Sequence, residues 1–325
     1  MRIAGVIPGG ANTLVQGPQE SVRFPFKHLM RKLLAACLVA LALSGTGAEI
    51  KSGFKRTEDV VYGRKFGTAL TLDVFQPART NGLGILFMVS GGWFSAHESI
   101  NTVFFGPLLD RGYTIFAVVH GSQPKFVVTE IMPDIHRAVR FIRHHAAEYG
   151  VDPNRLGITG GSAGGHLSLV MATQGVKGDP NAKDPVERES SEVQCVACFF
   201  PPTDFLNYSR PGEDGVGVGI LKGFKAAFGP RADTPEGRQK LGREISPIYF
   251  VHSNMPPVLI VHGDADQLVP ICQAQTFVKR CEEMGSPAKL IVREGKSHGW
   301  PDFGKDLEAF GDWFDRYLAS HHETK

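Results

Sequence analysis

The segment Gly160-Gly161-Ser162-Ala163-Gly164-Gly165 decides the fold. It has the pattern G-x-S-x-G, it follows an apolar run at residues 156–159, and it precedes a predicted helix at residues 163–173. A serine between a strand and a helix sits on a sharp turn, which requires small neighbouring residues. The segment therefore predicts that Ser162 is a nucleophile. The N–H of Ala163, at the start of the helix, is expected to face a developing oxyanion.

Strands and helices alternate on both sides of this turn. Apolar runs predict strands at residues 59–62, 70–75, 85–89, 115–119, 156–159, 193–200, 258–261 and 289–293. Helical periodicity and length predict helices at residues 131–149, 163–173, 272–284 and 307–318. This alternation favours an α/β fold in which a mostly parallel central sheet, with a leading antiparallel pair, carries helices on both faces.

One long stretch interrupts the alternation. Residues 201–257 are rich in glycine and lack a clear period. Connections of this length between strands are often functional, so the stretch is predicted to be a cap-like insertion over the site. A surface loop without a role is the alternative.

The predicted partners of the serine follow in the order aspartate and then histidine. The strand at residues 258–261 runs into a loop with two candidate acids, Asp264 and Asp266. Asp264 is close to the strand and suits the organisation of the turn, whereas Asp266 lies where a carboxylate can reach the site. His298 lies on a loop after the next strand, a position from which it can act as general base.

The loop Ser90-Gly91-Gly92-Trp93 follows the strand at residues 85–89. Because glycine lets the backbone approach a substrate closely, we expect Gly91 and Gly92 to complete the oxyanion hole with Ala163. A plain tight turn is the alternative. Trp93 and His97 lie in or beside this loop and are predicted to contact the substrate.

The composition fits one large globular domain. The chain has 325 residues, 42% of them hydrophobic, and a formal net charge of +2. No basic stripe indicates nucleic-acid binding. Cys195 and Cys198 lie three positions apart on a predicted strand, so they face opposite sides and are expected to be core residues. The sequence implies neither a metal nor an organic cofactor, and it leaves the oligomeric state open.

Residues 1–48 are predicted to be an N-terminal extension that ends in a signal peptide, and a true start at Met30 is the alternative for residues 1–29. A basic start at Met30, an apolar run at residues 33–43 and small residues up to Ala48 follow the order of a secretory signal. The apolar run is too short for a permanent membrane span, and an ordinary buried helix is the alternative. The signal at residues 30–48 predicts a secreted or periplasmic protein with a catalytic domain at residues 49–325.

These motifs together resemble the α/β-hydrolase superfamily. The likeness is greatest to the esterase branch related to hormone-sensitive lipase and to bacterial feruloyl and acetylxylan esterases. The motifs that carry the resemblance are Leu70-Thr71-Leu72-Asp73-Val74-Phe75-Gln76-Pro77, Gly91-Gly92-Trp93, Gly161-Ser162-Ala163-Gly164-Gly165-His166, His262-Gly263-Asp264-Ala265-Asp266 and Ser297-His298-Gly299.

The resemblance implies a Ser–His–Asp esterase that acts through an acyl-enzyme. In that family the later aspartate of the loop is the acid, which supports Asp266. The family has H-G-G-G before the tryptophan, whereas Val89 and Ser90 replace the histidine and the first glycine here. This departure leaves the second oxyanion donor open among Gly91, Gly92 and Trp93. The implied substrates are small-molecule or carbohydrate esters, such as acetyl or feruloyl esters of polysaccharides. A serine peptidase similar to prolyl oligopeptidase and a non-catalytic binding protein on the same fold are the alternatives.

Overall fold

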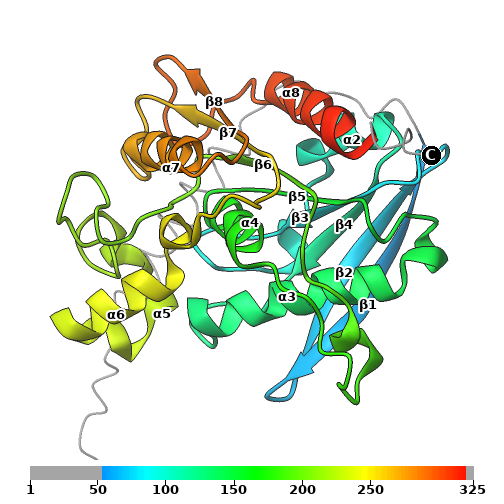
Figure 1. Cartoon of the computed structure of the whole chain (residues 1–325), viewed down its shortest axis with the longest axis horizontal. Helices are drawn as coiled ribbons and strands as arrows, with labels where there is room; N and C mark the ends of the chain where they lie inside the picture. The colour runs from blue at the N-terminus through cyan, green and yellow to red at the C-terminus, as the bar shows by residue number, and fades with distance from the viewer. Residues whose placement is uncertain (1–52, 320–325) are drawn as a thin grey trace, which may run out of the picture.

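The computed structural model describes residues 53–319, which form an eight-stranded sheet covered by helices (Figure 1). The order of the strands is β1-β2-β4-β3-β5-β6-β7-β8. Their bounds are β1 Phe54–Lys65, β2 Thr68–Pro77, β3 Gly84–Met88, β4 Thr114–Val119, β5 Leu156–Gly161, β6 Cys195–Phe199, β7 Val258–Gly263 and β8 Ala288–Arg293. Strand β2 pairs antiparallel with β1 and β4, and the pairs from β4 to β8 are parallel. The predicted α/β architecture is confirmed.

Helices cover both faces of the sheet (Figure 1). Their bounds are α2 Gly106–Asp110, α3 Val128–His144, α4 Ala163–Gln174, α5 Lys225–Phe228, α6 Pro235–Ile245, α7 Cys272–Glu283 and α8 Gly304–Phe314. Residues of α3, α4 and α7 belong to one buried apolar cluster, and residues of α2 and α8 belong to a second. Cys198 lies in the first cluster and Cys195 in the second, so the prediction that they face opposite sides is confirmed.

Several boundaries differ from the predicted ones. Strand β1 begins before residue 59 because backbone pairing with β2 extends it to Phe54, where the sequence has no alternating pattern. The helix predicted at residues 131–149 ends at His144 and continues as a 3₁₀ turn, which Gly150 stops with a φ of 65°. Helix α2 was not predicted, because its five residues are too few to show a helical period.

The insertion at residues 201–257 contains α5, α6 and several 3₁₀ turns. The carbonyl of Ile245 lies 2.7 Å from Nε2 of His166, a buried residue of α4. The insertion also buries Phe205 and Phe228, whose rings pack against Trp93 in the loop after β3. It is therefore a packed part of the domain that adjoins the loop with the predicted oxyanion glycines.

The predicted extension and signal peptide at residues 1–48 lie outside the described residues. Within residues 53–319, none of the helices has both the length and the apolar character that crossing a membrane requires.

Candidate active site

Ser162 occupies the sharp turn between β5 and α4 that the sequence predicts. Its backbone has φ 55° and ψ −119°, a combination that costs free energy in any residue with a side chain. The flanking glycines are required by close backbone packing. A Cβ atom at Gly160 would lie 2.7 Å from the carbonyl carbon of Gly164, and one at Gly164 would lie 2.7 Å from the carbonyl oxygen of Met88. The strain and the packing together present the Ser162 hydroxyl at the carboxyl end of the sheet.

The structure brings Ser162, His298 and Asp266 into one chain of hydrogen bonds. Nε2 of His298 lies 3.0 Å from Oγ of Ser162, and Nδ1 lies 2.7 Å from Oδ2 of Asp266. An ionised carboxylate only accepts hydrogen bonds, so Nδ1 carries the proton and Nε2 is free to accept the serine proton. The arrangement has the geometry that a nucleophile, a base and an orienting acid require.

Asp266 is buried and held as an ionised acceptor. Its Oδ1 accepts the backbone N–H groups of Leu268 and Val269, both at 2.9 Å. Burial alone would raise the pKa of the carboxyl, but hydrogen bonds from His262 and His298 outweigh it and hold that pKa well below its usual range. The competing Asp264 is exposed and accepts the N–H of Gly295 at 2.7 Å, as expected for a residue that organises the turn.

The oxyanion prediction is supported for Ala163 and Gly92 but wrong for Gly91. Ala163 is the first residue of α4, so its N–H has no partner inside the helix. The N–H of Gly91 already donates to the carbonyl of Phe94 at 2.9 Å, in a local two-residue bridge. Within the part of the chain that the structure describes, no group accepts the N–H of Gly92. The N–H of Trp93 is likewise without a described acceptor, so Ala163 with Gly92 or Trp93 can supply the donors.

The two residues predicted to contact the substrate have other partners in the structure. The Trp93 side chain is 2% exposed, and its Nε1 donates to Nδ1 of His166 at 3.2 Å, so it packs beneath the insertion. The ring of His97 faces the antiparallel strands instead of the triad. Its Nε2 lies 3.3 Å from Oδ1 of Asp73, and its Nδ1 lies 3.6 Å from Oδ1 of Asp59.

Phe200 is a site residue that the sequence did not reveal. It follows β6 with a φ of 34°, and its partly exposed ring lies 4.4 Å from the ring of His298, centroid to centroid. A strained aromatic residue against the base indicates a functional constraint. The available signal in the sequence was its place at the carboxyl end of a predicted strand.

The BD-FAE family model matches residues 72–281, which is more than half of the chain. The chain belongs to the BD-FAE family, a family of α/β-hydrolase esterases. The matched range contains Ser162 and Asp266 and ends before His298.

This BD-FAE chain is also similar to curated proteins of Mycobacterium tuberculosis. It is 28% identical over 231 residues to a probable carboxylic ester hydrolase, LipM, and the match covers 70% of this chain and 52% of LipM. It is 28% identical over 255 residues to the esterase LipQ, covering 75% of this chain and 56% of LipQ. The chain therefore spans about half the length of these relatives.

Solved structures share the fold. A truncated carbohydrate esterase from gut microbiota is 25% identical with a TM-score of 0.70, and the match covers 84% of this chain and 99% of that one. A butyrate-bound thermophilic esterase, Est2 of Thermogutta terrifontis, is 26% identical with a TM-score of 0.63, covering 84% and 97%.

A group of possible metal ligands lies where β1, β2 and the 3₁₀ turn at His97–Ser99 meet. Glu58, Asp73 and His97 each offer a ligand atom within 4.8 Å of the others. The guanidinium of Arg56 already pairs with Asp73 at 2.6 Å and with Glu58 at 3.1 Å. Because Arg56 pairs with both carboxylates, the group is explained without an ion.

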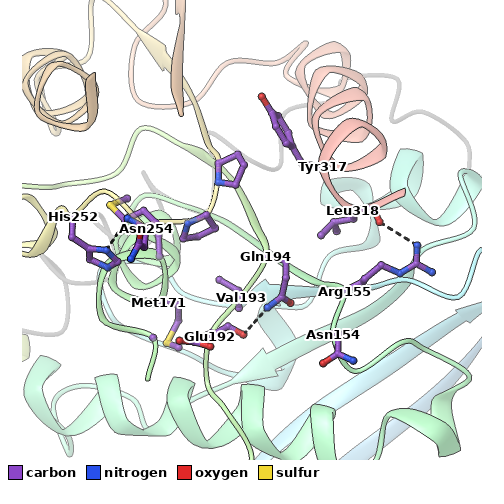
Figure 2. Close-up of a pocket in the computed structure, with 15 residues that line it drawn as sticks. Asn154, Arg155, Met171, Glu192, Val193, Gln194, His252, Asn254, Tyr317 and Leu318 are labelled. Atoms are coloured by element: carbon purple, nitrogen blue, oxygen red, sulfur yellow. Dashed lines mark hydrogen bonds between the residues drawn. The ribbon is translucent and has the colours of Figure 1, made fainter. Parts of the chain in front are cut away.

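Figure 2 shows the residues that line a cavity, whose volume is about 370 Å³. Its lining includes Arg155, Gln194 and Pro257, which directly precede β5, β6 and β7. These strands are parallel, so the cavity is at their amino ends, whereas Ser162 follows the carboxyl end of β5. The cavity is not part of the candidate active site.

Proposed function

We propose that this protein is a serine carboxylic ester hydrolase. The observation that carries the proposal is the hydrogen-bonded chain from Ser162 through His298 to Asp266. Membership of the BD-FAE family and similarity to proteins named as ester hydrolases support it.

The geometry supports an acyl-enzyme mechanism. Nε2 of His298 takes the Ser162 proton while Oγ attacks the ester carbonyl, and the N–H groups of Ala163 and Gly92 bind the oxyanion that forms. The imidazolium, stabilised by Asp266, gives the proton to the leaving alcohol as the ester C–O bond breaks. In the second half, His298 takes a proton from water, the hydroxide attacks the acyl carbon, and the acid leaves as the proton returns to Ser162 Oγ.

We propose that the substrates are small acyl esters, such as acetyl or feruloyl esters of polysaccharides. The similar structures include a carbohydrate esterase and an esterase with bound butyrate, a short-chain carboxylate. The Phe200 ring beside His298 adds an apolar surface where an acyl or alcohol group can pack.

The test is hydrolysis of an ester panel by wild type and by Ser162→Ala. The panel contains nitrophenyl esters of increasing acyl length, acetylated xylan and methyl ferulate. Loss of a triad nucleophile is expected to lower kcat by about 10⁶-fold. If the wild type hydrolyses none of the esters, the proposal is contradicted. Activity on aminoacyl anilides instead would favour the peptidase, and no activity on either class would favour a binding protein.

We also propose that the protein is exported through the signal at residues 30–48. Expression of the full chain followed by N-terminal sequencing of the exported product should find Glu49 as the first residue. An uncleaved product that stays with the cytoplasmic fraction would contradict export.

A further inference from the structure

A second serine–histidine pair lies at the start of the oxyanion loop. The oxyanion loop is Ser90-Gly91-Gly92-Trp93. Ser90 is the second residue after β3, and His120 directly follows the neighbouring parallel strand β4. Oγ of Ser90 lies 2.8 Å from Nε2 of His120. The Ser90 carbonyl also adjoins α4, since a Cβ atom at Gly164 would lie 3.6 Å from its oxygen. The pair therefore joins the oxyanion loop to the part of the sheet that presents Ser162.

The contacts of His120 fix the direction of this hydrogen bond. Nδ1 of His120 lies 2.7 Å from the carbonyl oxygen of Gly121, which only accepts, so Nδ1 carries the proton. Nε2 then accepts the hydroxyl proton of Ser90. The ring is 3% exposed, and burial lowers the His120 pKa to about 4, which keeps the ring neutral near pH 7. The Ser90 hydroxyl is thus held in one orientation.

Ser95 makes hydrogen bonds at the other end of the loop. Its Oγ donates to the carbonyl of Val89 at 2.5 Å and accepts the N–H of His120 at 3.2 Å. The carbonyl of Phe94 accepts a hydrogen bond from the N–H of Gly91. Two serines and one imidazole thus fix the backbone on both sides of Gly91 and Gly92.

We propose that Ser90 and His120 form a positioning pair, which holds the oxyanion loop so that the N–H of Gly92 meets the oxyanion formed at Ser162. Ser90 is one of the two residues, with Val89, at which this chain departs from the H-G-G-G pattern. It is not a second nucleophile and base, because a neutral carbonyl, that of Gly121, stands where a triad has its carboxylate. The inference rests on the proposed ester hydrolysis.

The structure offers a matched control pair. Nδ1 of His136 lies 2.9 Å from Oγ of Ser191, and burial lowers the His136 pKa to about 4, as it does for His120. His136 lies on α3, and Ser191 lies in the loop before β6, so this pair is at the amino side of the sheet. It has similar chemistry without a contact to the oxyanion loop.

The test compares Ser90→Ala, His120→Phe and His120→Gln with the control variants Ser191→Ala and His136→Gln on a nitrophenyl ester. Loss of one oxyanion donor costs about 10²- to 10³-fold in kcat, so misplacing it should cost about 10-fold or more, with KM little changed. Inhibition by an alkyl trifluoromethyl ketone, which forms a tetrahedral adduct, should weaken in parallel. His120→Gln keeps an acceptor for Ser90 and should recover part of the loss seen in His120→Phe.

Several outcomes would overturn the inference. Full kcat in folded Ser90→Ala, or equal losses in the control pair, would remove the positioning role while the ester hydrolase stands. Fluorophosphonate labelling of Ser90 in Ser162→Ala would make Ser90 a nucleophile instead. An inactive wild type would contradict both this inference and the proposed function.

Discussion

The ring centroids of Phe200 and His298 lie 4.4 Å apart, and their planes are inclined by 55°. The ring thus covers one side of the proposed base while its own backbone has a φ of 34°. We predict that Phe200→Ala lowers kcat/KM for short esters by about 10-fold, because lost packing lets the base leave its bonded geometry. Phe200→Gly should lose as much kcat/KM as Phe200→Ala. It should be more stable than Phe200→Ala in thermal unfolding, since glycine tolerates the positive φ. Wild-type kcat/KM in both variants would contradict a role for the ring.

The two aspartates of the loop after β7 should differ sharply in their effect on catalysis. Asp266→Asn is expected to lower kcat by about 10⁴-fold, because an amide no longer fixes the proton on Nδ1 of His298. Asp264→Asn is the matched control, since the only hydrogen bond described for the Asp264 side chain comes from the N–H of Gly295. Steady-state kinetics on one ester distinguishes them, and equal losses would contradict the assignment of Asp266.

Buried histidines should make the protein less stable in mild acid. Burial lowers the pKa of His120, His136 and His166 from 6.5 to about 4 each. Between these values the unfolded chain binds more protons than the folded chain, so the free energy of unfolding falls as the pH falls. Each histidine contributes at most about 1.4 kcal/mol per pH unit.

Urea unfolding at pH 7 and at pH 5 measures this dependence. His136→Gln removes one titrating group and should reduce the difference between the two pH values. An unchanged difference in that variant would show that His136 does not titrate in this range.

The hairpin between β1 and β2 contains a turn residue that can be improved. Phe66 and Gly67 form the two-residue turn with φ 45° and 73°, and Phe66 is 78% exposed. A two-residue turn with both φ values positive favours Asn-Gly, so Phe66→Asn should raise the free energy of unfolding by about 0.5–1 kcal/mol. Gly67→Ala should lower it, since alanine disfavours the positive φ. Thermal unfolding of both variants checks the opposite signs, and a loss of stability in Phe66→Asn would contradict the argument.

Local sequence predicted the parts of the site that depend on local geometry. Ser162 and its glycines were predictable because the strained turn needs small residues at fixed positions. His298 was predictable from its loop after a parallel strand, since the carboxyl ends of such strands meet at one edge of the sheet. The choice of Asp266 over Asp264 rested both on loop position and on the resemblance to the esterase family.

The errors arise where distant segments decide the environment. Trp93 was predicted to face substrate, but Phe228, far along the chain, helps bury it beneath the insertion. The N–H of Gly91, predicted as an oxyanion donor, instead donates to the carbonyl of Phe94. No residue pattern in the sequence indicates this hydrogen bond. Phe200 was missed because an apolar residue at a strand end has the same sequence pattern in a core and in a site.

Intact-mass analysis after treatment with a fluorophosphonate tests the central claim, nucleophilic catalysis by Ser162, most directly. Adduct formation and ester hydrolysis are followed in the same sample, and the modified peptide is sequenced. The account predicts one adduct per chain, on Ser162, with hydrolysis lost in proportion to labelling and no adduct in Ser162→Ala. Full hydrolysis by the labelled protein, or an adduct on another residue that accounts for the loss, would contradict it.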